Sequence, residues 1–265
     1  MLVRTIIAVI FGPLIIYLSY LGGLWLVGMI FILAGIGISE FVIQSLGKRS
    51  PFLLSLSVLF TVGLVLSSTL LNFTITLMIY ITFLLLIGML LSIRNQPPAD
   101  LFRQILLLSW GTGYIGLLYP FVYHIRELTA TGDWLLFLFG TIWLSDSLAM
   151  WVGTAFGRRK LAPTVSPNKT VAGFVGGMSG GIIIAVILHF WRLSDFHIYS
   201  LVFAGLLVSF VGQLGDLVES CWKRSLDIKD SSTIIPGHGG VLDRFDSLLF
   251  AAPVLHLYLK YFIFK

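Results

Sequence analysis

Half of the acidic residues of this 265-residue chain lie in one short stretch, because six of the twelve fall between Asp216 and Asp246. The sequence on either side of this stretch is almost entirely apolar. A charged side chain within or beside a lipid bilayer is costly unless it is paired, hydrated or bound to a metal. The clustering therefore predicts a functional site built from ionisable side chains.

The acidic residues of this stretch are spaced for cation binding. Asp216 and Glu219 are three residues apart and would share one face of a helix, and Asp243 and Asp246 have the same spacing. Oxygen ligands of this kind suit Mg²⁺, which keeps several waters and shares ligands with substrate phosphates. The single cysteine, Cys221, excludes an intramolecular disulfide and a multi-cysteine metal site. The alternative is a set of surface charges that only neutralise one another, although such pairs contribute little stability.

A glycine-rich turn and several cations lie between these acids. The glycines of the turn Pro236-Gly237-His238-Gly239-Gly240 let the backbone approach a ligand closely and can form an anion-binding nest. His238 could donate a hydrogen bond to a substrate, act as a general acid or base, or be only a turn residue. The other polar residues of interest in this region are Lys223, Arg224, Lys229, Asp230 and Arg244.

A second polar segment, residues 157–172, has the composition of a phosphate site. Pro163 and Pro167 stiffen this segment because proline fixes the backbone angle φ. Lysine supplies charge, hydroxyl and amide groups supply hydrogen bonds, and the following helix adds backbone donors at its N-terminus. The alternative is an ordinary basic loop on the cytoplasmic side of a membrane protein. The residues that this segment would present are Ser166, Asn168, Lys169 and Thr170.

Asp146 is a third candidate, because it is an isolated carboxylate in the apolar stretch that leads into this basic segment. It is either a ligand for a metal or substrate, or a carboxylate that Ser145, Ser147 or an arginine of a neighbouring helix satisfies. Its position on the helix that continues into the basic segment favours the first interpretation.

The composition predicts a polytopic membrane protein whose class is all-α. Hydrophobic residues make up 57% of the chain and charged residues only 11%, which is too apolar for one soluble core. Helices are expected because a bilayer offers no water to exposed backbone groups. Stretches long enough to cross the bilayer occur at 5–21, 24–45, 53–71, 74–93, 104–124, 134–156, 173–191, 199–221 and 246–263.

The distribution of basic residues predicts how these nine transmembrane helices are oriented. Nine spans leave only Arg126, Arg192, Lys260 and Lys265 on one side of the membrane, so the other side holds thirteen of the seventeen lysines and arginines. The positive-inside rule then places the N-terminus in the cytoplasm, together with both polar segments. The net charge of +5 follows largely from this asymmetry.

The organisation predicted from these patterns has two parts. Residues 1–133 form about five N-terminal spans, and residues 134–265 form a catalytic membrane region with cytoplasmic loops at 157–172 and 222–245. Glycines at every fourth position of the span 173–191 allow close helix packing. A cation or phosphate transporter is a rival interpretation, but its expected internal repeat with broken helices is not visible.

The residues between Ser220 and Asp246 closely resemble a signature of phosphatidate cytidylyltransferases, which are also called CDP-diacylglycerol synthases. The shared elements are a serine, Lys-Arg, Lys-Asp, Pro-Gly-His-Gly-Gly and Asp-Arg-x-Asp at the expected spacings. A second family motif is similar to Asp146 followed by residues 157–170. The motifs together cover residues 143–247, whereas the first 130 residues resemble the family only in hydropathy.

Two residues depart from the family pattern. Asn168 stands where glycine or lysine is common, and Ala172 stands where glutamate or glutamine is usual. The second departure puts in doubt any polar contact made from that position, but not the core chemistry.

The resemblance implies an Mg²⁺-dependent reaction in which CTP and phosphatidic acid give CDP-diacylglycerol and pyrophosphate, with a second cation whose identity is open. It implies catalytic roles for Asp216, Lys223, Arg224, His238, Asp243, Arg244 and Asp246. The expected cation ligands are Asp146, Asp216, Asp243 and Asp246. The expected substrate contacts are Ser166, Lys169, Thr170, Lys229, Asp230, Gly237, Gly239 and Gly240.

The partners expected from the resemblance are CTP, phosphatidic acid in the bilayer and a second copy in a homodimer, without nucleic acid. The expected location is the cell (inner or cytoplasmic) membrane, with the active site facing the cytoplasm. A different CTP-using lipid enzyme, such as a CDP-archaeol synthase or a polyprenol kinase, is the nearer alternative, and the complete motif argues against the kinases. The Asp-Gly-x-x-Ala-Arg motif of alcohol phosphatidyltransferases is absent.

Overall fold

The computed structural model describes residues 2–47, 50–129, 131–235 and 239–264. Within these ranges the chain forms ten α-helices, one two-stranded hairpin and a π-helical end. The elements are α1 (Leu2–Leu21), α2 (Gly23–Leu46), α3 (Pro51–Leu70), α4 (Phe73–Ser92), α5 (Pro98–Leu118), α6 (Pro120–Glu127), α7 (Asp133–Phe156), β1 (Lys160–Ala162), β2 (Ser166–Thr170), α8 (Val171–Trp191), α9 (Ile198–Ser225), α10 (Leu242–Tyr258) and η1 (Leu259–Ile263). The predicted helical class is confirmed.

Seven helical segments in the described residues are long and apolar enough to cross a membrane. They are α2, α3, α4, the run Pro98–Glu127 that contains α5 and α6, α7, α8 and α9. Every predicted span falls on helical residues, but α1, in which the described apolar part is Val9–Leu21, and α10, with 17 residues, are not among these seven segments. The chain is therefore built as an integral membrane protein, whereas the count of nine spans and the orientation stay predictions.

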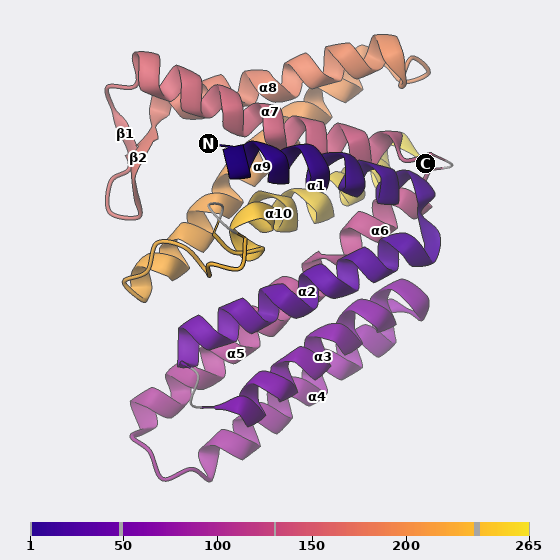
Figure 1. Cartoon of the computed structure of the whole chain (residues 1–265). Coiled ribbons are helices and arrows are strands. Elements are labelled where there is room, and N and C mark those ends of the chain that lie inside the picture. Colours follow the sequence, from indigo (N-terminus) through magenta and orange to yellow (C-terminus); the bar gives the residue numbers. More distant parts are fainter. Residues whose placement is uncertain (1, 48–49, 130, 236–238, 265) are drawn as a thin grey trace.

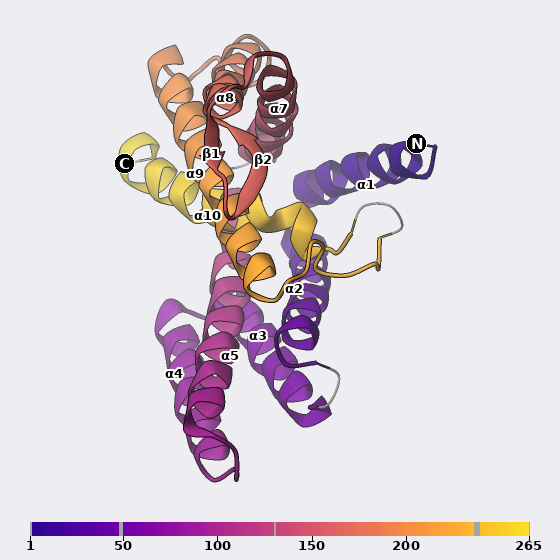
Figure 2. The ribbon, with the colours of Figure 1, turned by 90° about the vertical axis from the view of Figure 1, so that its left-hand side faces the viewer.

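The helices form two groups that α10 joins. Helices α2, α3, α4 and α5 pack together, and α8 packs against both α7 and α9 in the other group (Figure 1). Helix α10 contacts α9, α7, α6, α5 and α2, and its Leu249, Ala252 and Leu255 are fully buried. Viewed from the end that carries the hairpin, α10 lies between the two groups (Figure 2). Residues at the start of α10 can therefore touch both groups.

Helix α8 approaches its two neighbours through glycines, as the four-residue spacing predicts. A Cβ atom on Gly173 would lie 2.6 Å from the carbonyl oxygen of Ala149 in α7. A Cβ atom on Gly181 would lie 2.1 Å from the carbonyl oxygen of Gly205 in α9. Backbone atoms cannot rotate away, so the α8–α9 crossing requires glycine at position 181.

We therefore expect Gly181→Ala to lower stability by about 1–3 kcal/mol, because the added methyl must push two helices apart. Thermal unfolding in detergent measures this loss. Gly88→Ala in α4 is the matched control, since a Cβ atom there meets nothing within 4 Å and alanine favours a helix. Equal melting temperatures for the two variants would contradict the close packing.

The structure corrects the predicted loop 157–172, because most of it is a β-hairpin. Strands β1 and β2 pair antiparallel with Lys160 opposite Thr170 and Ala162 opposite Ser166. Pro167 lies within β2, where a two-stranded ribbon tolerates the missing N–H group. Hydrogen bonding between the strands, together with the prolines, therefore holds this segment in place.

The predicted loop 222–245 is bordered by helical turns in the structure. Helix α9 continues to Ser225, so Lys223 and Arg224 lie in its last turn, where cations complement the helix dipole. Helix α10 already begins at Leu242, which puts Asp243 in its first turn and on the same helix as Asp246. Which of these residues lie outside the membrane stays a prediction.

Candidate active site

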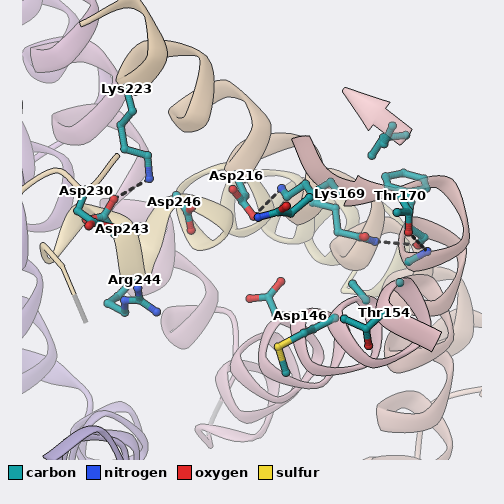
Figure 3. A pocket seen from close by; sticks show the side chains of 18 residues that line it. Asp146, Thr154, Lys169, Thr170, Asp216, Lys223, Asp230, Asp243, Arg244 and Asp246 are labelled. Carbon is teal, nitrogen blue, oxygen red and sulfur yellow. Dashed lines mark hydrogen bonds and ion pairs between the residues drawn. The ribbon is translucent and has the colours of Figure 1, made fainter. Parts of the chain in front are cut away.

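A cavity of about 470 Å³ lies where α7, α8, α9, the start of α10 and the hairpin meet. Side chains from segments far apart in the sequence point into it (Figure 3). The predicted site residues that line it are Asp146, Lys169, Thr170, Asp216, Lys223, Asp230, Asp243, Arg244 and Asp246. Ser166, Arg224, Lys229, Gly239 and Gly240 are outside its lining, and Gly237 and His238 are outside the described residues.

Three carboxylates from three different helices face this cavity. Asp146 of α7, Asp216 of α9 and Asp246 of α10 turn toward a common space (Figure 3), and the charge of Asp216 acts on both Asp146 and Asp246. Like charges that converge in a protein interior repel one another unless a proton or a cation intervenes. The cluster is therefore suited to binding a cation.

The interpretation of Asp146 as a carboxylate satisfied by its neighbouring serines has no support in the hydrogen bonds of the described residues. The Ser147 hydroxyl donates to the carbonyl oxygen of Trp143 at 2.8 Å. The Ser145 hydroxyl is buried and has no partner among the described residues. The groups that act electrostatically on Asp146 are instead residues of the cavity, namely Asp216, Lys169 and Arg244.

Lys169 connects the hairpin to this acidic cluster. Its Nζ atom lies 2.6 Å from Oδ2 of Asp216, and the Ser220 hydroxyl donates to Oδ1 of the same carboxylate at 3.3 Å. The neighbouring Thr170 caps α8, since its Oγ1 atom accepts the N–H of Gly173 at 3.1 Å. The start of α8 and the charge of Lys169 are thus placed together at one wall of the cavity.

Lys223 forms a second, more buried charge cluster with two acids. Its Nζ atom lies 2.7 Å from Oε2 of Glu219 and 2.6 Å from Oδ1 of Asp243. The Glu219 side chain is 0% exposed and that of Asp243 is 4% exposed. Buried charges of this kind persist only when they are paired and hydrogen-bonded, so the position of the Lys223 ammonium depends on both acids.

The Asp243 carboxylate is held in its ionised form by the groups around it. Its Oδ2 atom accepts the backbone N–H groups of Ser231 and Gly240, each at 2.8 Å, and the Ser231 hydroxyl at 2.9 Å. Burial raises the pKa of Asp243, but hydrogen bonds and the charge of Lys223 lower that pKa by more, so the net shift is downward. Both carboxylate oxygens are therefore engaged by protein donors.

The donor chemistry of the cavity fits Mg²⁺, although the ligand set is not a preformed cage. Among the described residues no three Asp, Glu, His or Cys side chains are close enough to hold an ion by themselves. Mg²⁺ needs few protein carboxylates because water and substrate phosphates complete its shell. Asp216 fits that role better than Asp243, because its side chain is 31% exposed and that of Asp243 only 4%. That any of the four predicted carboxylates binds a cation stays a prediction.

The sequence of this chain matches one protein family over nearly its whole length. The family model described as "Cytidylyltransferase family" matches residues 2–262, which is nearly the whole chain. The chain belongs to the cytidylyltransferase family. The family match therefore extends through the N-terminal helices, beyond residues 143–247, where the signature motifs lie.

Three relatives in this family carry the name phosphatidate cytidylyltransferase. The chain is 40% identical to the one from Bacillus subtilis (strain 168) over 180 residues, which are 68% of this chain and 66% of that protein. It is 33% identical to the one from Staphylococcus haemolyticus over 263 residues, which are 98% of this chain and 99% of that protein. It is 34% identical to the one from Staphylococcus saprophyticus over 268 residues, with the same two shares. The predicted family resemblance is confirmed.

Arg224 is a predicted phosphate contact, but its guanidinium donates to backbone carbonyl oxygens and the residue does not line the cavity. Its guanidinium donates to the carbonyl oxygens of Val165 at 3.3 Å and Ile228 at 2.7 Å. These contacts tie the hairpin to the end of α9. Its predicted contact with phosphate stays a prediction.

Gln213 and Glu40 are polar residues near this cavity that the predictions from the sequence did not include. Gln213 lines the cavity one helical turn before Asp216, and its Nε2 atom donates to the carbonyl oxygens of Phe174 and Ser209. Glu40 of α2 is buried against the start of α10. Both are isolated polar residues in apolar helices, and this signal in the sequence could have identified them.

Proposed function

We propose that this protein transfers the cytidylyl group of CTP to phosphatidic acid and so produces CDP-diacylglycerol and pyrophosphate. The observation that carries the proposal is the cavity, which five carboxylates and three cations line within a chain of the cytidylyltransferase family. The names of the full-length relatives agree with this substrate pair. Both substrates are anions, and a site for them needs positive charge near apolar helices.

In the proposed reaction a phosphatidate oxygen attacks the α-phosphorus of CTP. The bond between the α-phosphorus and the bridging oxygen breaks, and its electron pair leaves with pyrophosphate. Lys169, Lys223 and Arg244 line the cavity and would offset the repulsion between the two anions. The attacking phosphate is already ionised near neutral pH, so His238 is not needed as a general base.

The residues that would hold Mg²⁺ are Asp146, Asp216 and Asp246, with Asp243 as a further candidate. When bound, Mg²⁺ supplies charge stabilisation for the attacking and leaving oxygens. The identity of a second cation is left open in this proposal. Asp216 also holds the Lys169 ammonium at 2.6 Å, and Lys169 and Arg244 act electrostatically on Asp146.

The active site is proposed to face the cytoplasm, with the protein in the cell membrane. The hairpin, the end of α9, the end of α2 and the start of α5 lie at the same side of the molecule (Figure 1). The sequence places most basic residues on that side, and the positive-inside rule assigns such a side to the cytoplasm. CTP would arrive from there while phosphatidic acid arrives from the bilayer. A homodimer is part of the proposal on the family resemblance alone.

Release of pyrophosphate from CTP by purified protein in detergent tests this function. We expect release only when phosphatidic acid and Mg²⁺ are both present. Formation of CDP with a polyprenol in place of phosphatidic acid would indicate a polyprenol kinase, because a kinase transfers the γ-phosphate of CTP and leaves CDP. No release with any lipid or cation, from monodisperse protein that binds CTP, would overturn the enzyme assignment and favour a transporter.

A further inference from the structure

Glu40 is a buried carboxylate in the part of the chain that lacks the signature motifs. It lies in α2 and is 2% exposed. Its Oε1 atom accepts the Val241 N–H at 3.0 Å and the Ser232 hydroxyl at 2.5 Å. Its Oε2 atom accepts the Leu242 N–H at 2.9 Å and lies 3.3 Å from the Ser231 hydroxyl. Three donors from the loop after α9 and the start of α10 thus surround a single side chain, with the Ser231 hydroxyl beside them.

These contacts supply a helix cap that α10 lacks in its own sequence. The residue at the N-cap position is Val241, which has no polar side chain and makes no cap hydrogen bond. The first N–H groups of a helix need acceptors, and a carboxylate at that end also interacts favourably with the helix dipole. Glu40 provides both from a different helix. The N-terminus of α10 is therefore occupied by protein and is not open to a substrate phosphate.

The same contacts lead directly to the cavity. The Ser231 hydroxyl lies near the Glu40 carboxylate. The same hydroxyl and the Ser231 N–H both donate to Asp243. A Cβ atom on Gly240 would lie 2.0 Å from the Ser231 Oγ atom and 2.6 Å from Glu40, so this packing has no room for a side chain. Asp243 in turn holds Lys223 at 2.6 Å. Glu40 is thus linked to a cavity lysine through one loop and one carboxylate.

Neighbouring residues of α2 hold the other end of the same loop. Phe41 stacks on Trp222 of α9 with ring centroids 4.5 Å apart, and the Trp222 indole N–H donates to the Ser45 hydroxyl at 3.1 Å. Gln44 donates to the carbonyl oxygen of Ser231 at 2.8 Å. Residues 40–45 of α2 therefore contact the end of α9, the loop after it and the start of α10.

We propose that Glu40 is a positioning residue for the transfer reaction, acting through Ser231 and Asp243 on Lys223; this inference rests on the proposed function. Its carboxylate fixes the loop after α9 and the first turn of α10. These elements aim Asp243 at Lys223 and set the position of Asp246 one turn later. The N-terminal helices then serve the chemistry as well as the membrane.

Glu40→Gln is the variant that tests this role with little change in volume. The amide keeps one acceptor oxygen but presents an NH₂ group to donors that need an acceptor. We expect kcat/KM for the transfer to fall about 10- to 100-fold, since charge-assisted hydrogen bonds from two backbone N–H groups and the Ser232 hydroxyl are disturbed. Glu127→Gln is the matched control, because Glu127 is an exposed glutamate at the end of α6.

Two readouts separate positioning from a simple loss of folded protein. The KM for CTP or phosphatidic acid should rise in Glu40→Gln, whereas a smaller folded fraction lowers the apparent kcat and leaves both KM values unchanged. Amide hydrogen exchange of residues 226–235 should also be faster in Glu40→Gln than in the wild type or the control, whatever the activity. If Glu40→Gln does not accumulate, Ser232→Ala removes one donor from the loop side and should change both readouts in the same direction.

Each outcome decides the inference. Unchanged KM values and unchanged exchange in Glu40→Gln, with an active wild type, would overturn the role of Glu40 and leave the proposed function intact. A wild type without cytidylyl transfer would overturn the proposed function, while the exchange comparison would still report whether Glu40 holds the loop.

Discussion

Asp216→Asn should lower kcat by about 10³-fold while leaving the protein folded. Asp216 lines the cavity together with Asp146 and Asp246 and is paired with Lys169 at 2.6 Å. Asparagine has nearly the same shape but no charge, so it would bind a cation more weakly and would no longer hold the Lys169 ammonium. Steady-state pyrophosphate release with the purified variant measures the loss.

Asp195→Asn is the matched control for this substitution, because Asp195 is an exposed aspartate in the connection between α8 and α9. We expect the control to keep the activity of the wild type. Wild-type kcat in Asp216→Asn, at equal purity and melting temperature, would remove this carboxylate from the mechanism.

Lys223→Met should destabilise the protein by about 3–5 kcal/mol and abolish the transfer reaction. Methionine fills a similar volume, but it leaves Glu219 and Asp243 buried without a countercharge. The cavity also loses one of the cations available to substrate phosphates. Thermal unfolding in detergent and pyrophosphate release measure the two effects on the same preparation.

Lys260→Met provides the comparison, because Lys260 is exposed in η1. Its melting temperature and activity should stay close to those of the wild type. If Lys223→Met unfolded at the wild-type temperature, the ion pairs of Lys223 would not support the fold as described. If that variant also kept its activity, Lys223 would have no role in the reaction.

Hydropathy was sufficient to locate the helices because membrane spans carry a long, strong apolar signal. It could not locate their ends, since Lys223 and Arg224 continue α9 as polar residues of its last turn. The hairpin was missed for a related reason. Strands as short as Lys160–Ala162 have no measurable alternation of polar and apolar residues, and their pairing depends on residues that follow several positions later.

The acids and cations of the site were visible in the sequence because charges stand out in an apolar chain. The different surroundings of these residues could not be predicted, because they depend on distances between helices. Asp216 and Asp243 cannot be told apart in the sequence, yet the side chain of Asp216 is 31% exposed beside Lys169 and that of Asp243 is 4% exposed among backbone N–H donors. Glu40 was overlooked because its partners are about 190 to 200 positions away in the chain.

The most direct test of the account follows the phosphorus atoms of CTP. Purified protein would be incubated with phosphatidic acid, Mg²⁺ and CTP labelled either at the α-phosphorus or at the γ-phosphorus. We predict that the α label moves into the lipid fraction and that the γ label stays in water as pyrophosphate. Transfer of the γ label to lipid would indicate a kinase and contradict the account, as would the absence of label in lipid from both substrates.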